Sequence, residues 1–140
     1  MHHALRHPRD ADRRDAVVGV LTVDDDPAFL RLARDVIEAA PGFEVLGEAA
    51  TGEDGILQVA VLRPQLVLMD VRMPGMGGIE AARRITHVDS RIAVILVSAN
   101  PFAVAPGIVP PRAIGLVGKE RLGPRSLRAL WDDWTQERRR

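Results

Sequence analysis

The sequence of 140 residues contains no cysteine and no tyrosine, and aromatic residues make up only 4% of it. Without cysteine the chain forms no disulfide, offers no thiolate to a metal and has no thiol nucleophile. Long apolar runs are also missing, and the stretch at residues 92–97 is far too short to cross a bilayer. The N-terminal residues lack the apolar core of a secretory signal. We therefore expect a cytoplasmic protein without a membrane partner.

The chain has no excess charge of either sign, because 19 lysine and arginine residues balance 19 aspartate and glutamate residues. A balanced chain has no global basic field, so we expect no direct binding to nucleic acid. Lysine itself is rare, and Lys119 is the single one in a chain that otherwise uses arginine. An ammonium and a guanidinium differ in shape and hydration, so we treat Lys119 as a candidate functional residue.

The 46% of apolar residues suits one globular domain, which we place at residues 16–137. Residues 1–15 are polar and of mixed charge, so we expect them to be disordered, and residues 138–140 to form a basic tail. Between these ends, short apolar runs typical of buried strands alternate with segments of helical periodicity. The expected strands cover residues 16–23, 43–49, 66–69, 92–97 and 114–117, and the expected helices cover about 27–40, 51–62, 78–86 and 124–134. This alternation predicts an α/β fold with a doubly wound, five-stranded parallel sheet.

One segment breaks the alternation of strands and helices. Residues 100–112 follow the fourth expected strand, where a helix is due, yet they hold four of the ten prolines. A proline inside a helix costs about 3 kcal/mol. We therefore expect an irregular loop with at most one helical turn, near residues 102–105.

Polar side chains follow the apolar runs at four of the expected strand ends. They are Asp24 and Asp25 after the first strand, Asp70 after the third, Ser98 after the fourth and Lys119 after the fifth. Ligands of doubly wound sheets bind beyond the carboxyl ends of the strands, so these groups are expected to meet there. Clustered carboxylates favour a hard cation such as Mg²⁺. A carboxylate such as that of Asp70 can be a nucleophile that forms an acyl phosphate, with the ammonium and the hydroxyl nearby to contact the phosphoryl oxygens.

Four motifs carry a resemblance to a known family. They are Val23-Asp-Asp-Asp-Pro27, Leu68-Met-Asp-Val-Arg-Met-Pro-Gly-Met-Gly-Gly78, Val97-Ser-Ala99 and Gly118-Lys119. In order and spacing they resemble the motifs of response-regulator receiver domains of bacterial two-component signalling, over roughly residues 17–134. The resemblance implies a flavodoxin-like receiver fold with sheet order 2-1-3-4-5. It also implies a phosphoacceptor domain of a phosphorelay, which is not an enzyme but assists its own phosphoryl transfer.

The resemblance assigns roles to the acidic residues. It implies that Asp70 is the phosphoacceptor and a ligand of Mg²⁺, that Asp25 is a direct Mg²⁺ ligand, and that Asp24 acts on the metal through water. The backbone carbonyl of Arg72 would complete the metal site.

The resemblance also implies the partners of the domain. Ser98 would be the switch hydroxyl and Lys119 the lysine that pairs with the phosphoryl group. The donor would be a histidine kinase or a phosphotransfer protein, and a downstream protein would be bound or released on phosphorylation. Receiver dimers often use the face of the fourth helix, the fifth strand and the fifth helix, so a homodimer is open.

Two departures from the family lie on the output side. Leu116 occupies the position, three residues before the lysine, that is commonly aromatic in the family, and the prolines of residues 101–111 replace the helix that usually moves. They keep open the alternative of a phosphorylation-independent interaction module that retains the receiver fold. A phosphatase resembling the haloacid dehalogenases fits less well, because Arg72 stands where that family has a second aspartate.

The length of the chain bears on its domain content. It ends at Arg140, 21 residues after Lys119, and the last expected helix uses most of them. We therefore expect a stand-alone receiver, while a fragment of a longer regulator stays open.

Overall fold

The computed structural model describes residues 16–110 and 113–139, so the segment predicted to be disordered, residues 1–15, lies outside the described residues. The strands are β1 (Val18–Val23), β2 (Phe43–Ala49), β3 (Leu66–Asp70), β4 (Ala93–Ser98) and β5 (Ala113–Gly118). They form one parallel sheet in the order β2-β1-β3-β4-β5. The α-helices within the described residues are α2 (Pro27–Ala39), α3 (Gly52–Leu62), α4 (Gly78–Val88) and α5 (Pro124–Arg138). The predicted five-stranded sheet and its order are confirmed.

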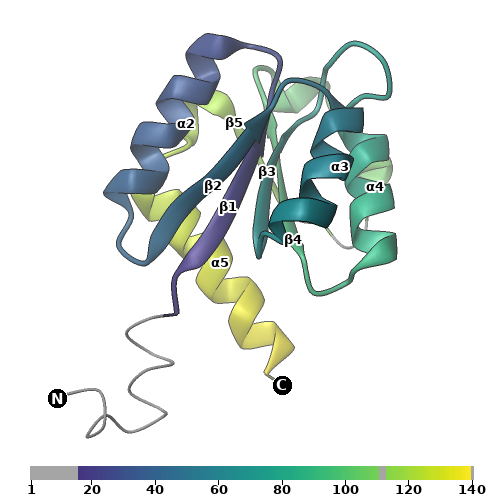
Figure 1. Ribbon diagram of the computed structural model, residues 1–140. Coiled ribbons are helices and arrows are strands. Elements are labelled where there is room, and N and C mark those ends of the chain that lie inside the picture. Colours follow the sequence, from purple (N-terminus) through teal and green to yellow (C-terminus); the bar gives the residue numbers. More distant parts are fainter. Residues whose placement is uncertain (1–15, 111–112, 140) are drawn as a thin grey trace, which may run out of the picture.

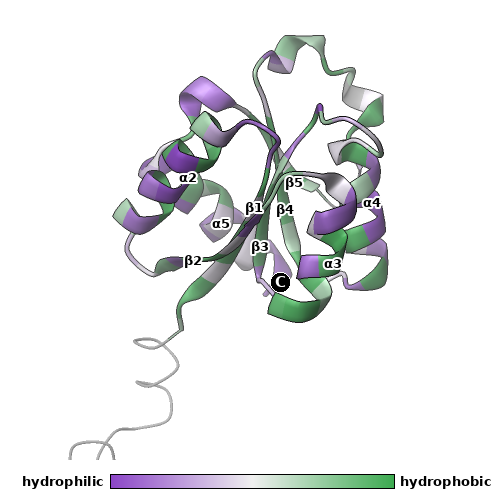
Figure 2. Cartoon of the chain, turned by 45° about the horizontal axis from the view of Figure 1, so that its top comes forward, coloured by the Kyte–Doolittle hydropathy of each residue, from purple (hydrophilic) through white to green (hydrophobic). Residues whose placement is uncertain are grey.

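The sheet is covered by helices on both faces, with α2 and α5 on one side and α3 and α4 on the other (Figure 1). The central strands are therefore buried on both faces, as their continuous apolar runs predict. Leu68 and Ile95 belong to the core under α2 and α5, whereas Val67 and Leu96 belong to the core under α3 and α4. Figure 2 shows the hydrophobic residues gathered along the sheet. This sandwich holds the carboxyl ends of the strands at one edge.

The helices begin where the sequence supplies caps. The side chain of Asp26 accepts a hydrogen bond from the backbone N–H of Ala28 at 2.9 Å, and Pro27 follows as the first helical residue of α2. The hydroxyl of Thr51 accepts a hydrogen bond from the backbone N–H of Asp54 at 3.0 Å and starts α3. These side chains satisfy N–H groups that have no partner within the helix.

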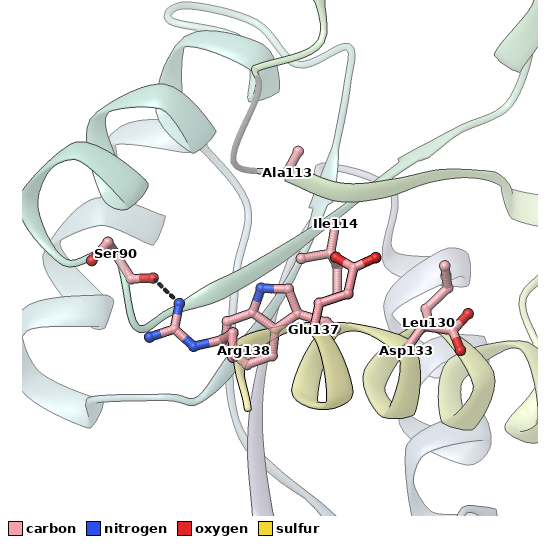
Figure 3. A pocket seen from close by; sticks show the side chains of 8 residues that line it. Ser90, Ala113, Ile114, Leu130, Asp133, Glu137 and Arg138 are labelled. Carbon is pink, nitrogen blue, oxygen red and sulfur yellow. Dashed lines mark hydrogen bonds between the residues drawn. The ribbon is translucent and has the colours of Figure 1, made fainter. Parts of the chain in front are cut away.

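Helix α5 is longer than the sequence predicts and includes Arg138, a residue expected in the terminal tail. The guanidinium of Arg138 donates a hydrogen bond to the backbone carbonyl of Ser90 at 3.1 Å, as Figure 3 shows. It also lies over the ring of Trp134, 4.7 Å from the centroid. These contacts continue the helix past the residue where its apolar stripe ends. Although α5 is the longest described helix, no helix in the described part of the chain has the length and apolar character to cross a bilayer.

The segment between β4 and β5 contains no α-helix within its described residues, as its prolines predict. Two short 3₁₀ turns stand there, Pro101–Ala103 and Pro106–Ile108. The prediction allowed one helical turn, and the second one is a difference from it. A 3₁₀ turn tolerates proline at its start because the missing N–H has no partner within the turn in any case. With so little helix beside it, most of β5 is only half-buried.

Candidate functional site

The parallel sheet brings the predicted site residues to one edge. Asp24 directly follows β1, Asp70 is the last residue of β3, Ser98 is the last residue of β4 and Lys119 directly follows β5. Carboxylate oxygens of Asp24, Asp25 and Asp70 lie within 4.8 Å of one another. Residues from different strands thus form one carboxylate cluster, which we define as Asp24, Asp25 and Asp70.

Asp24 is fixed and fully buried, whereas Asp25 is exposed. The backbone N–H of Asp24 donates to the carbonyl of Ala49 at 2.9 Å, which extends the pairing of β1 with β2 by one residue. Its carboxylate oxygen Oδ1 accepts a hydrogen bond from the backbone N–H of Asp26 at 2.8 Å. The run of three aspartates therefore divides into a buried carboxylate, an exposed carboxylate and a helix cap.

The single lysine of the chain reaches into the carboxylate cluster. The Nζ atom of Lys119 lies 2.7 Å from Oδ2 of Asp24 and 3.6 Å from Oδ1 of Asp70. The ammonium also lies over the ring of Phe29, 4.7 Å from its centroid. Partial burial by itself lowers the pKa of Lys119, but the contact with Asp24 and the charge of Asp70 outweigh it and raise the pKa above its usual value. Lys119 is therefore a permanent cation between two buried carboxylates.

Asp70 is the residue of the cluster whose pKa is displaced most clearly. Burial and then the charge of Asp24 raise its pKa to about 6, against the opposing effects of Lys119 and of a hydrogen bond from the backbone of Arg72. The side chain of Asp70 is only 6% exposed. At neutral pH it is an anion that is poorly solvated, and poor solvation makes a carboxylate a better nucleophile and a better ligand for a cation.

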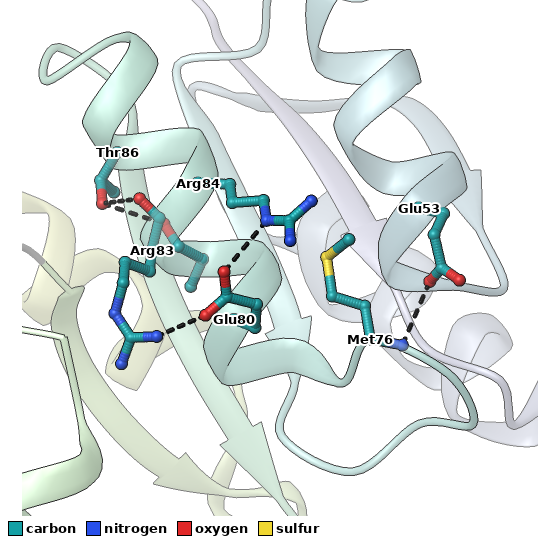
Figure 4. A network of polar contacts seen from close by, with 7 residues as sticks. Glu53, Met76, Glu80, Arg83, Arg84 and Thr86 are labelled. Atoms are coloured by element: carbon teal, nitrogen blue, oxygen red, sulfur yellow. Dashed lines mark hydrogen bonds and ion pairs between the residues drawn. The ribbon is translucent and has the colours of Figure 1, made fainter.

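The loop after Asp70 is held at both ends. The backbone N–H of Gly78 donates to the carbonyl of Val71 at 3.0 Å, and the N–H of Met76 donates to the side chain of Glu53 on α3 at 3.4 Å (Figure 4). A Cβ atom on Gly78 would lie 1.6 Å from the backbone carbonyl oxygen of Asp70. Only glycine lets α4 start this close to the end of β3, so position 78 determines where the phosphoacceptor candidate sits.

Ser98 ends β4 at the same edge of the sheet as the cluster and is 5% exposed. Asp70 pairs with Val97 across the two strands, so Ser98 is one residue further along β4. Its hydroxyl oxygen accepts a hydrogen bond from the backbone N–H of Asn100 at 3.1 Å, which leaves the hydroxyl proton available to another acceptor. Leu116 is half-buried and packs against the core under α3 and α4. The hydrogen bond between Ser98 and Asn100 thus holds the start of the loop that follows β4.

The carboxylate cluster suits a hard divalent cation by its chemistry. All the side-chain donors are carboxylate oxygens, two of them on rigid strand ends and one exposed to solvent. Mg²⁺ prefers such oxygen ligands, retains several waters and leaves room for a phosphate. The backbone of Arg72 lies beside the cluster, since its N–H contacts Asp70, and the Arg72 side chain is exposed.

A family model described as the response regulator receiver domain matches residues 20–105 of this chain. The chain belongs to this family. The matched part contains the carboxylate cluster and Ser98, while Lys119 lies beyond it.

Curated relatives of this receiver domain are considerably longer proteins. It is 41% identical over 81 residues to a protein-glutamate methylesterase/protein-glutamine glutaminase of Nocardioides sp., a match that covers 58% of this chain and 22% of that protein. It is 37% identical over 89 residues to the response regulator GacA of Pseudomonas protegens, with 61% of this chain and 42% of the relative covered. The receiver domain thus spans less than half of each of these relatives.

Solved structures with the same architecture include isolated receiver domains. The signal receiver domain of the putative response regulator NarL of Mycobacterium tuberculosis is 28% identical, with a TM-score of 0.71 over 83% of this chain and 94% of that one. The response regulator domain of Thermotoga maritima CheB is also 28% identical, with a TM-score of 0.69 over 83% and 95% of the two chains. These likenesses agree with the strand order of the receiver fold.

Two features of the site were not assigned a role from the sequence. Phe29 fits the helical spacing of a core residue, and it is buried, but its ring also lies under the ammonium of Lys119. Gly78 ends the motif Leu68–Gly78, yet its close approach to the backbone of Asp70 follows only from the three-dimensional path of the chain. The Gly77-Gly78 pair at the start of α4 is the sequence signal for such a close approach.

Proposed function

We propose that this receiver domain accepts a phosphoryl group on Asp70 in a Mg²⁺-dependent reaction, and that a phosphohistidine of a histidine kinase or phosphotransfer protein is the donor. The observation that carries the proposal is the position of Asp70. It is a buried carboxylate with a pKa raised to about 6 by burial and by Asp24, and it lies 3.6 Å from the ammonium of Lys119. The membership of the receiver family supports the same role.

The chemistry that follows from this arrangement is a displacement at phosphorus. A carboxylate oxygen of Asp70 forms the new P–O bond while the P–N bond to the donor imidazole breaks, and the imidazole leaves with the bonding electron pair. The bond that forms is an acyl phosphate, and no oxidant or reductant is needed. Burial favours the step because the nucleophile has little water to shed before it attacks.

Asp24, Asp25, Asp70 and the backbone carbonyl of Arg72 are the groups proposed to hold Mg²⁺. When bound, the cation neutralises charge that the cluster and the phosphoryl group would otherwise accumulate. The residues of the chain supply the remaining contacts. Ser98 is proposed to donate its hydroxyl proton to one phosphoryl oxygen, and Lys119 to exchange its contact with Asp70 for a contact with another.

The proposal is tested by exposing the full chain to acetyl phosphate with and without Mg²⁺ and measuring its intact mass. We expect a Mg²⁺-dependent gain of one phosphoryl group that disappears in Asp70→Asn and on chelation. Asp25→Asn should lower the fraction of phosphorylated protein at limiting Mg²⁺, because it removes a ligand from the exposed side of the cluster. Asp133→Asn, an exposed carboxylate of α5, is the matched control and should be labelled like the wild type.

A downstream protein that distinguishes the two forms is also part of the proposal. Beryllofluoride with Mg²⁺ imitates the phosphoryl group, so amide signals of residues 99–110 should shift if the loop after Ser98 transmits the change. If beryllofluoride bound near Asp70 and no partner affinity changed, the phosphorylation-independent module would be the better description. Absence of both the label and the beryllofluoride effect would contradict the phosphoacceptor proposal itself.

A further inference from the structure

Helix α3 carries apolar side chains on the face turned away from the core as well as on the face turned toward it. From Gly55 to Leu62, Gln58 is the only polar residue. Leu57 is 67% exposed and Val61 is 79% exposed. Figure 2 shows hydrophobic colour over the C-terminal turns of α3. A surface helix normally has a polar outer face, so this apolar surface indicates a site of interaction.

A groove lies next to this surface, between α3 and α4, which stand side by side on one face of the sheet (Figure 1). On α3 it is lined by Ile56, Val59 and Ala60, which share one helical face at the spacing i, i+3, i+4. On α4 it is lined by Ile85 and Val88. The hollow has a volume of about 350 Å³, and Val88 at its rim is 86% exposed.

The groove continues into a second hollow of about 560 Å³, toward the end of the sheet opposite the carboxylate cluster, and this part is basic. Arg63 and Arg91 line it. Arg91 forms an ion pair with Asp89 at 3.0 Å. Arg84, on the wall of the first hollow, forms an ion pair with Glu80 at 3.0 Å, and Glu80 also pairs with Arg83 (Figure 4). Arg63 forms no ion pair within residues 16–110 and 113–139. Among the described residues, the groove therefore ends at a positive charge that has no ion-pair partner.

Arg63 also has an unusual backbone conformation. It ends α3 with a φ of 51°, and it is the one residue other than glycine with a positive φ in the described chain. This left-handed position at a helix end is normally taken by glycine, because a Cβ atom is disfavoured there. An arginine in place of glycine is an outlier of the kind that marks functional positions.

We propose that the α3–α4 groove binds an amphipathic helix of a partner protein, with apolar residues in the groove and acidic residues beside Arg63. Each groove helix has 11 residues, or about 16 Å, enough to seat about three turns of a third helix. The uncompensated charge selects an acidic partner. A second copy of this chain fits less well, because its own groove carries the same positive charge. None of these residues belongs to the carboxylate cluster, so the inference goes beyond the proposed phosphoacceptor role.

The test uses three capped synthetic peptides of about four helical turns. One has leucines along one face with glutamates on both borders, the second has lysines in place of the glutamates, and the third has serines in place of the leucines. Binding to the full chain is followed by fluorescence anisotropy and by amide chemical shifts. The glutamate peptide should bind at least about tenfold more tightly than either of the others, and its shifts should gather in α3 and α4.

Variants of the groove make the test specific. Val88→Ser removes an exposed apolar side chain and should lower the affinity for the glutamate peptide about fivefold. Arg63→Gly should lower this affinity about threefold. Because glycine suits the left-handed backbone conformation, unfolding of the variant would not explain the loss of affinity. Arg31→Gln, an exposed arginine on α2, is the control and should change nothing.

Four results would overturn the proposal. They are failure of the glutamate peptide to bind, equal affinity of the glutamate and lysine peptides, an affinity that Val88→Ser does not change, and amide chemical-shift changes outside α3 and α4. Self-association that Val88→Ser abolishes in sedimentation velocity would instead make a second copy the occupant. Co-sedimentation with anionic phospholipid vesicles that the same change abolishes would make a lipid surface the occupant.

Discussion

Replacing Asp70 by asparagine should stabilise the folded protein at neutral pH when divalent cations are absent. Burial and the charge of Asp24 raise the pKa of Asp70 from 3.8 to about 6. At neutral pH the carboxyl of Asp70 is ionised in both states, but its ionisation is less favourable in the folded protein than in the unfolded chain. At about 1.36 kcal/mol per pKa unit, this difference lowers the free energy of unfolding by about 3 kcal/mol. Asparagine has nearly the same shape and nothing to ionise, so the variant should recover that amount.

The direction of the pKa shift determines the pH at which this gain is seen. A carboxyl whose pKa is raised by folding destabilises the fold only where it is ionised in the unfolded chain. The destabilisation is therefore absent well below pH 3.8, grows between the two pKa values and is complete above about pH 6. The difference between Asp70→Asn and the wild type should be about 3 kcal/mol near pH 8 and about 1 kcal/mol near pH 4.5.

Urea unfolding followed by circular dichroism in the presence of a chelator measures this difference directly. The dependence on urea should be the same for both proteins, so that the midpoints report stability alone. Glu44→Gln removes an exposed carboxylate of β2 and should change the free energy of unfolding by less than about 0.5 kcal/mol. Added Mg²⁺ should narrow the gap, because it stabilises the wild type by binding. A destabilised Asp70→Asn, or a gap independent of pH, would refute this reasoning.

Three further changes follow from the same contacts. Lys119→Met removes the ammonium from between two carboxylates, so calorimetry should show Mg²⁺ binding at least about threefold tighter, and unchanged affinity would contradict the geometry. Gly78→Ala places a Cβ 1.6 Å from the carbonyl oxygen of Asp70, so thermal unfolding should show a loss of about 3 kcal/mol or more. Gly107→Ala meets no atom within 4 Å and is its control, with a change below about 0.5 kcal/mol. Arg63→Gly relieves a positive φ of 51° and should raise the free energy of unfolding by about 0.5–1 kcal/mol, while a loss would argue against backbone strain there.

The fold could be predicted because its signals are local and repeat along the chain. Buried parallel strands require continuous apolar runs, and residues 66–69 and 92–97 have the length and composition of such strands. The meeting of Asp24, Asp70 and Lys119 also followed, since parallel strands place their carboxyl ends at one edge. The prolines of residues 101–110 excluded an α-helix for the same local reason.

The remaining features depend on contacts between residues far apart in sequence. The true end of α5 depends on Arg138 reaching Ser90, which is 48 positions earlier. The sequence did not reveal that apolar residues of α3 are exposed. Ala60, for example, has the spacing of a residue on the inner face of the helix, yet it is exposed in the structure. Periodicity locates a helical face but does not say how much of it a neighbouring helix covers.

Asp70 is the residue proposed to carry the phosphoryl group. The most direct test of this role is reduction of the acetyl-phosphate-treated protein with borohydride, which converts an acyl phosphate of aspartate into homoserine, followed by peptide sequencing by mass spectrometry. The proposal predicts homoserine at position 70, only when Mg²⁺ is present during phosphorylation. Homoserine at Asp24 or Asp25, or at no position, would contradict it.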